Sequence, residues 1–314
     1  MATNLQKMLA DLRVSHTPKS LPKRRLKVLN TYLDTTLKEI QVAHQQGASG
    51  THIVQALTQR MDTLIGALYE EGVAAKGHSP SRYTVLAQGG YGRGALNPRS
   101  DIDLLFLFEK KVEEGDLVTR MILHTLWDLR FEVGYSTRTL SECVIAAQED
   151  TDSLTSMLEA RHLVGNKNLA QELENVLAKR FFGRKARGFI NSKVQERTRR
   201  HSRAGFSVQL LEPNIKESPG GLRDTHSVGW FLKARRGLKA PEGLLDDHIL
   251  TKRNYKLYVD ALNFLLRTRN ALHFHTQKPI DVLEHDLQPI VSKSLGYTDS
   301  DGELGVEHFM RDYY

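Results

Sequence analysis

A glycine-rich turn followed closely by two aspartates is the feature that most constrains the fold of this chain. Four glycines lie within residues 89–94, and ten residues separate Gly90 from Asp101. The flanking runs Tyr83–Ala87 and Ile102–Phe108 are short and apolar, which is typical of buried strands. The sequence therefore predicts a strand, a glycine-rich turn and a second strand.

Asp101 and Asp103 flank a single apolar residue, Ile102, at the start of the second predicted strand. Residues i and i+2 of a strand point to the same face, so the two carboxylates project together while Ile102 turns into the core. Adjacent carboxylates repel each other unless a cation lies between them. Mg²⁺, with Mn²⁺ as an alternative, prefers such oxygen ligands, so we predict that both aspartates bind metal and act in catalysis.

The glycine-rich turn is predicted to hold phosphates. Gly89 and Gly90 carry no Cβ, so backbone N–H groups can approach phosphate oxygens, and Arg93 adds a charged donor. Alone, the turn could be a tight loop and the Asp pair a solvated strand end. The turn also lacks the spacing of a dinucleotide-binding fingerprint and the Lys-Ser/Thr of a P-loop. Together, the two elements point to nucleotidyl transfer.

The same segment resembles the DNA polymerase β-type nucleotidyltransferase superfamily. Its fuller pattern resembles one branch, the bacterial PII uridylyltransferase/uridylyl-removing enzymes (GlnD type). The resemblance covers about residues 25–314 and is carried by residues 89–94, 96–98, 100–106, 127–129, 133–143, 157–165 and 212–224.

The resemblance, together with the strand and helix patterns, implies an α+β fold in which a small mixed sheet is surrounded by helices. We expect a helical N-terminal extension (1–78), a nucleotidyltransferase core (79–145) and a helical region that binds substrate or nucleotide (146–314). The implied activity is Mg²⁺-dependent transfer of UMP from UTP to a tyrosine of the PII nitrogen-signalling protein, with release of pyrophosphate. Ser100, Lys216 and Arg223 match motif positions and join the expected nucleotide contacts.

Three positions depart from the family pattern without removing a candidate metal ligand. Ala95 stands where the family often has Glu, Arg99 replaces an aromatic residue or His, and Ser218 replaces Gly. The HD-type hydrolase and ACT domains of the family are not expected in this chain, which we interpret as the transferase half, without uridylyl-removing activity. The isolated doublet His285–Asp286 lacks the further ligands that a hydrolase metal site needs.

The third acidic residue that polymerase β-type sites commonly use is not identified by the sequence. The third predicted strand has one acid, Glu132, at its start, and Glu142, Glu149 and Asp150 follow on a predicted helix. All four remain open.

Hydrophobic periodicity predicts most of the remaining elements. Two helices are expected within residues 21–71, separated at 47–51, with Ser49 or Thr51 as N-cap. The other predictions are a helix at 116–130, a strand at 132–140, helix through almost all of 141–195, a helix at 257–274 and a frayed segment at 1–20.

Composition favours a globular cytoplasmic protein. The 314 residues are 40% hydrophobic and 26% charged, Cys143 is the single cysteine, and no apolar run is long enough to span a membrane. The net charge of +7 is concentrated in residues 180–203, which we interpret as a solvated helix face, so that nucleic acid is an unlikely partner.

Two other functions remain as alternatives. The basic stretch is compatible with a nucleotidyltransferase that acts on RNA or a small molecule. The lack of an identified third acidic residue is compatible with a non-catalytic nucleotide-sensing module. The loop at 212–224 could likewise be an ordered loop locked by an ion pair of Arg223.

Overall fold

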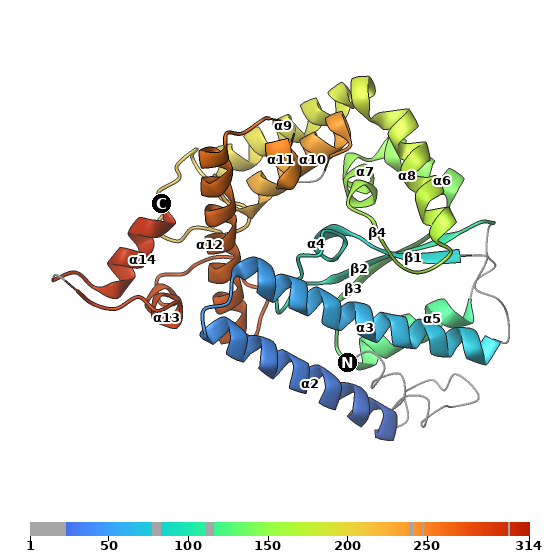
Figure 1. Cartoon of the computed structure of the whole chain (residues 1–314), viewed down its shortest axis with the longest axis horizontal. Coiled ribbons are helices and arrows are strands. Elements are labelled where there is room, and N and C mark those ends of the chain that lie inside the picture. Colours follow the sequence, from blue (N-terminus) through green and yellow to red (C-terminus); the bar gives the residue numbers. More distant parts are fainter. Residues whose placement is uncertain (1–22, 77–82, 111–115, 239–240, 247, 301) are drawn as a thin grey trace. The chain divides into compact units, whose positions relative to one another are not determined.

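The computed structural model describes residues 23–76, 83–110, 116–238, 241–246, 248–300 and 302–314 (Figure 1). The chain forms two compact units. The first consists of residues 1–40, 55–96 and 100–177, and the second of residues 41–54, 97–99 and 178–314. The expected fraying of residues 1–20 concerns residues outside the described part.

A mixed sheet forms the centre of the first unit, as predicted, and it has four strands. Its order is β3-β2-β1-β4, in which β1 (Tyr83–Ala87) and β2 (Ile102–Phe108) are antiparallel and β3 (Val133–Thr139) runs parallel to β2. All five residues of β1 and six of the seven in β2 are buried, because these strands lie in the middle of the sheet. The three predicted strands are confirmed.

The fourth strand corrects the sequence-based prediction. Residues 157–165 were expected to be helical, but Arg161–Gly165 forms β4, which pairs antiparallel with β1. Periodicity cannot distinguish a short apolar run in a strand from a piece of buried helix. Pairing with β1, about eighty residues earlier in the chain, selects the strand.

Two long helices, α2 (Lys23–Gln45) and α3 (Gly50–Lys76), precede the sheet. Ser49 is the N-cap, since its Oγ accepts a hydrogen bond from the backbone N of His52 at 3.2 Å. Within the first unit the two helices are antiparallel (Figure 1), and the buried ion pair of Arg25 with Glu71 joins them.

The remaining helices of the first unit begin at well-defined caps. Asp116 caps α5 (Leu117–Asp128), which connects the parallel strands β2 and β3, and Thr139 forms a capping box with Glu142 on α6 (Leu140–Glu149). They are followed by α7 (Thr151–Leu158) and α8 (Lys167–Phe181), the last of which runs into the second unit.

The second unit is helical. Its elements are η2 (Gly183–Ala186), α9 (Arg187–Arg203), α10 (Leu222–Arg236), α11 (Glu242–Asp246), α12 (Lys252–Thr276), α13 (Gln288–Ser294) and α14 (Gly305–Tyr313). The predicted helix at 257–274 is the central part of α12. None of the described helices has the combination of length and apolar character that a membrane span requires.

Candidate active site

The two predicted metal-binding aspartates lie at the start of β2. Asp101 immediately precedes the strand and is exposed, Asp103 is half-buried within it, and Ile102 between them is 2% exposed. The alternation expected from the sequence is therefore present. Two neighbouring carboxylates, one of them open to solvent, are a donor set that fits a hard divalent cation.

The glycine-rich turn lies against Asp103. The backbone N of Gln88 donates to the backbone O of Asp103 at 2.9 Å. Gly89 has a φ of +55°, and a Cβ at this position would lie 2.7 Å from Asp103 Oδ2. The structure thus brings the predicted phosphate-binding turn and the predicted metal-binding residue together.

The turn continues into a single helical turn, α4 (Gly89–Gly92), where the sequence predicted a loop. The first backbone N–H groups of a helix have no acceptor within that helix. The N–H groups at the start of α4 therefore point outward from its N-terminal end. Tyr91 anchors this element: its ring is fully buried, the Arg161 guanidinium lies 5.4 Å from its centroid, and burial raises its pKa well above the usual value. Arg161 is itself held by two hydrogen bonds to Asp62, at 2.9 and 3.0 Å.

Arg93, the charged donor predicted for phosphate, forms an ion pair with Glu159 at 2.5 Å. The Glu159 side chain is 6% exposed and that of Arg93 is 25% exposed, so the guanidinium is held in place but remains partly open. Gly90 lies nearby: a Cβ there would be 3.7 Å from Arg93 Nη2. Ser100, also predicted to contact nucleotide, is half-buried immediately before Asp101.

Among the residues that the structure describes, no third carboxylate joins the pair. Glu142 is used in the cap of α6 and Asp150 caps α7, while Glu132 and Glu149 are exposed. Within the described ranges, no group of three or more His, Cys, Asp or Glu side chains is arranged to hold a metal ion. The residue of β3 that pairs in register with Asp103 is Gly134, so the strand next to the site has no acid at that position.

The structure also adds two residues that sequence reasoning missed. Nothing in the sequence marks Glu159 as the partner of Arg93, since 66 residues separate them. Gly134 did carry a signal, because a glycine inside a strand often marks a close approach of another group.

The predicted residues Lys216 and Arg223 belong to the second unit. Lys216 lies in the loop that leads into α10, and Arg223 is the second residue of that helix. The Asn214 side chain accepts hydrogen bonds from the backbone N of Lys216 and of Glu217, at 3.0 and 2.8 Å. Ser218, where the family has glycine, uses its Oγ to accept a bond from Asn214 N at 2.9 Å. The departure at position 218 therefore adds a bond that holds the loop.

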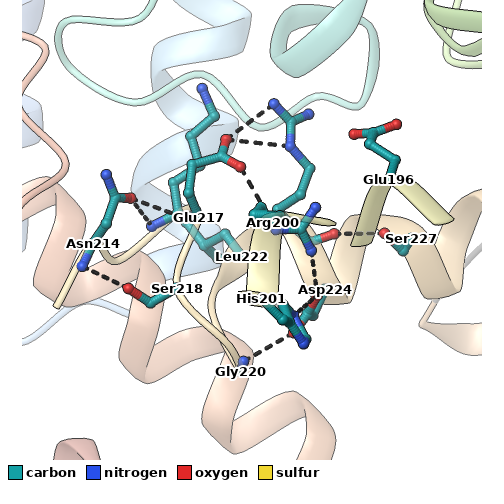
Figure 2. Close-up of polar contacts among 12 residues, drawn as sticks. Glu196, Arg200, His201, Asn214, Glu217, Ser218, Gly220, Leu222, Asp224 and Ser227 are labelled. Carbon is teal, nitrogen blue, oxygen red and sulfur yellow. Dashed lines mark hydrogen bonds and ion pairs between the residues drawn. The ribbon is translucent and has the colours of Figure 1, made fainter. Parts of the chain in front are cut away.

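Ion pairs fix the end of this loop. Figure 2 shows Arg200 and His201 of α9 both directed at Asp224, which also accepts a bond from Gly220 N at 2.9 Å. Arg223 donates to Glu217 at 3.1 Å. This is the ion pair that was expected if residues 212–224 are simply an ordered loop.

Lys216 has a different environment. Burial lowers the pKa of its ammonium group, Arg269 acts in the same direction, and Asp281 opposes both. Its carboxylate neighbour Asp281 is already bonded to Arg269 at 2.6 Å and to His273 at 3.3 Å. Lys216 is thus a half-buried cation beside a carboxylate that other donors already occupy.

The basic stretch only partly follows the predicted solvated face. Lys193 is buried, pairs with Glu196 at 2.7 Å and lies 5.1 Å from the Trp230 ring centroid. Arg200 pairs with Asp224. The exposed cations of the stretch are Arg180, Arg184, Lys185, Arg187, Arg197, Arg199 and Arg203.

Comparisons with known proteins agree with this geometry. Residues 74–161 match the nucleotidyltransferase domain family, and residues 188–314 match the family described as GlnD PII-uridylyltransferase. The chain is similar to proteins named bifunctional uridylyltransferase/uridylyl-removing enzyme. The protein from Caulobacter vibrioides (strain NA1000 / CB15N) is 38% identical over 86% of this chain and 29% of its own length. That from Phenylobacterium zucineum is 35% identical over 99% of this chain and 34% of its own length.

A third relative, from Cereibacter sphaeroides, is 41% identical over 74% of this chain and 25% of its own length. The chain therefore spans about a third or less of the length of these relatives. The two family matches, the relatives and the mixed sheet with its glycine turn and Asp pair agree. The chain belongs to the GlnD-type uridylyltransferase/uridylyl-removing family and corresponds to its nucleotidyltransferase portion.

Proposed function

We propose that this chain catalyses the Mg²⁺-dependent transfer of UMP from UTP to a tyrosine of the PII signalling protein, with release of pyrophosphate. The observation that carries the proposal is the contact between the glycine-rich turn and the carboxylate of Asp103. It brings the proposed phosphate-binding element next to the proposed metal ligand, and nucleotidyl transfer requires both kinds of element. The names of the relatives supply uridylyl as the group and PII as the acceptor.

The reaction exchanges one phosphorus–oxygen bond for another. The acceptor tyrosine oxygen attacks the α-phosphorus of UTP, the bond to the α,β-bridging oxygen breaks, and pyrophosphate leaves with that electron pair. The proton of the tyrosine hydroxyl passes to solvent. Asp101 and Asp103 would hold Mg²⁺, which neutralises triphosphate charge and stabilises the attacking and leaving oxygens.

The chain's own donors would orient the nucleotide. The N–H groups of Gly89 and Gly90 and the guanidinium of Arg93 are assigned to the triphosphate, with Ser100 beside them. Glu159 holds Arg93 in one orientation, which reduces the entropy lost when phosphate binds. In the second unit, Lys216 and Arg223 are assigned to further anionic groups of the nucleotide or acceptor.

The proposed location is the cytoplasm. The single cysteine, Cys143, is buried and free, and a chain without disulfides is typical of a reducing compartment.

The test is incubation of the chain with Mg²⁺, purified PII protein and each α-labelled nucleoside triphosphate in turn. We expect label transfer and a UMP-sized mass gain on PII with UTP alone. Asp103→Asn should reduce transfer about 100-fold or more, because the metal contributes several kcal/mol to the transition state.

Asp34→Asn is the matched control, since Asp34 is exposed on α2 of the same unit. It should leave transfer unchanged. Full activity of Asp103→Asn at saturating Mg²⁺ would refute the metal assignment. Nucleotide binding without any metal-dependent release of pyrophosphate would instead point to the non-catalytic sensing module.

An RNA acceptor is the second candidate, and one tertiary contact favours it. Residues 175–195 and 225–241 together hold ten Lys and Arg residues and no Asp or Glu. Their combined formal charge of +10 exceeds the net charge of +7 of the whole chain. Arg235 Nη1 donates to Gly183 O at 3.0 Å, which brings the end of α10 to the basic η2 segment. RNA that accepts label, with an affinity that falls steeply with salt, would favour this reading over PII.

A further inference from the structure

Gly134 lies within β3 although nothing in its backbone conformation requires glycine. Its φ is not in the positive region, and the strand is in register with β2 along its whole length. Glycine in a strand interior weakens the strand, because it loses more backbone freedom on folding and has no side chain to pack. Some other group must account for the missing side chain.

That group is the carboxylate of Asp103. A Cβ built on Gly134 would lie under 3.0 Å from Asp103 Oδ1 and 3.6 Å from its Cγ. Apart from its chain neighbours, no other described residue would come within 4 Å of it. Gly89 stands on the other side, where a Cβ would lie 2.7 Å from Oδ2. Each carboxylate oxygen of Asp103 therefore abuts a glycine, one from the phosphate-binding turn and one from β3.

Other glycines of the chain are required for a different reason. A Cβ on Gly92 would meet the backbone oxygens of Glu159 and Ala87, and a Cβ on Gly221 would meet that of Ile215 at 2.7 Å. Backbone atoms cannot move without disturbing the fold. At Gly134 the obstacle is the end of a flexible side chain, which can rotate away while the strand stays in place.

We infer that Gly134 is a positioning residue: the absence of its side chain leaves room for the orientation in which Asp103 presents its carboxylate. The inference rests on the proposed role of Asp103 as a metal ligand. Mg²⁺ demands near-ideal octahedral geometry with ligands at about 2.0–2.1 Å, so a rotated carboxylate loses its place in the coordination shell. A side chain at position 134 should therefore weaken metal binding and leave the fold intact.

The test compares Gly134→Ala and Gly134→Val with wild type in the full chain. Binding of Mn²⁺ in the presence of UTP, followed by electron paramagnetic resonance without any acceptor, measures metal affinity apart from turnover. We expect affinity to fall about tenfold or more for Ala and further for Val, as for other residues that orient metal ligands. The melting temperatures should remain close to that of wild type, because Val is favoured in strands.

Gly66→Ala is the matched control. Gly66 lies within α3, and a Cβ there would meet nothing within 4 Å, so both metal affinity and stability should be retained. Wild-type Mn²⁺ affinity in Gly134→Val would overturn the inference, and so would a fall in affinity that follows a matching fall in melting temperature.

Failure of the proposed function gives a different result. If wild type binds Mn²⁺ and UTP but transfers nothing to PII, the proposed transfer to PII is wrong, and a Gly134→Val defect in Mn²⁺ binding still supports the positioning role. If wild type binds no Mn²⁺, both the metal assignment and the role of Gly134 are refuted.

Discussion

Replacement of Asp281 by asparagine should destabilise the second unit strongly. Asp281 accepts hydrogen bonds from Arg269 Nε at 2.6 Å, from Arg269 Nη2 at 3.2 Å and from His273 at 3.3 Å. The side chains of Asp281, Arg269 and His273 are 14%, 11% and 0% exposed. Burial lowers the pKa of His273, so at neutral pH Arg269 supplies the positive charge of this cluster.

The expected loss follows from leaving Arg269 without its counter-charge. Removing one partner of a buried ion pair costs about 3–5 kcal/mol, since the other charge stays desolvated. Asparagine keeps the volume and one acceptor oxygen, so we expect about 3 kcal/mol, the lower end of that range. Loss of the nearby carboxylate charge also removes the interaction that opposes the lowered pKa of Lys216.

Urea denaturation followed by tryptophan fluorescence can report this unit alone. The chain has two tryptophans: Trp230, which is 3% exposed in the second unit, and Trp127, which is 43% exposed in the first. A Trp127→Phe background leaves Trp230 as the probe. Asp286→Asn, at an exposed neighbouring position, is the control and should change stability by less than about 0.5 kcal/mol.

The pH dependence gives a second check. Burial alone would raise the pKa of Asp281, but the bonds from His273 and Arg269 lower it overall, below the usual 3.8. The stabilisation is therefore complete above the unfolded-state pKa and is lost as pH falls through the folded-state value. The difference between wild type and Asp281→Asn should be full at pH 7 and shrink at strongly acidic pH. A variant no less stable than Asp286→Asn at pH 7 would refute this reasoning.

Two further predictions concern a buried histidine and a glycine of the turn. Burial lowers the pKa of His44 from 6.5 to about 4. The stabilising contribution of the neutral imidazole is therefore complete above pH 6.5 and is lost as pH falls towards 4. His44→Phe should remove up to about 3 kcal/mol of this loss of stability in acid, measured by urea denaturation at several pH values. Gly92→Ala should destabilise the first unit by about 1–3 kcal/mol in thermal unfolding, because its Cβ would meet the backbone oxygens of Glu159 and Ala87; an unchanged melting temperature would contradict the packing shown by the structure.

Local patterns determined a large part of this protein. The alternation of Asp101, Ile102 and Asp103 predicts two carboxylates on one face, because the side-chain period of a strand is two. Hydrophobic periodicity also predicted the helices at 116–130 and 257–274 and the three strands. Such a pattern depends only on residues a few positions apart in the sequence. The family followed from short motifs within single segments.

The tertiary structure decided everything that depends on residues far apart in the sequence. Residues 161–165 form a strand because β1 is available to pair with them, and Arg93 is held because Glu159 lies beside it. The parallel register of β2 and β3 places Gly134 opposite Asp103. Register and ion pairing are chosen by the packing of whole elements, whose energies a local stretch of sequence does not contain. The sequence alone thus supplied the reactive groups, and the packing of the strands decided which residues surround them.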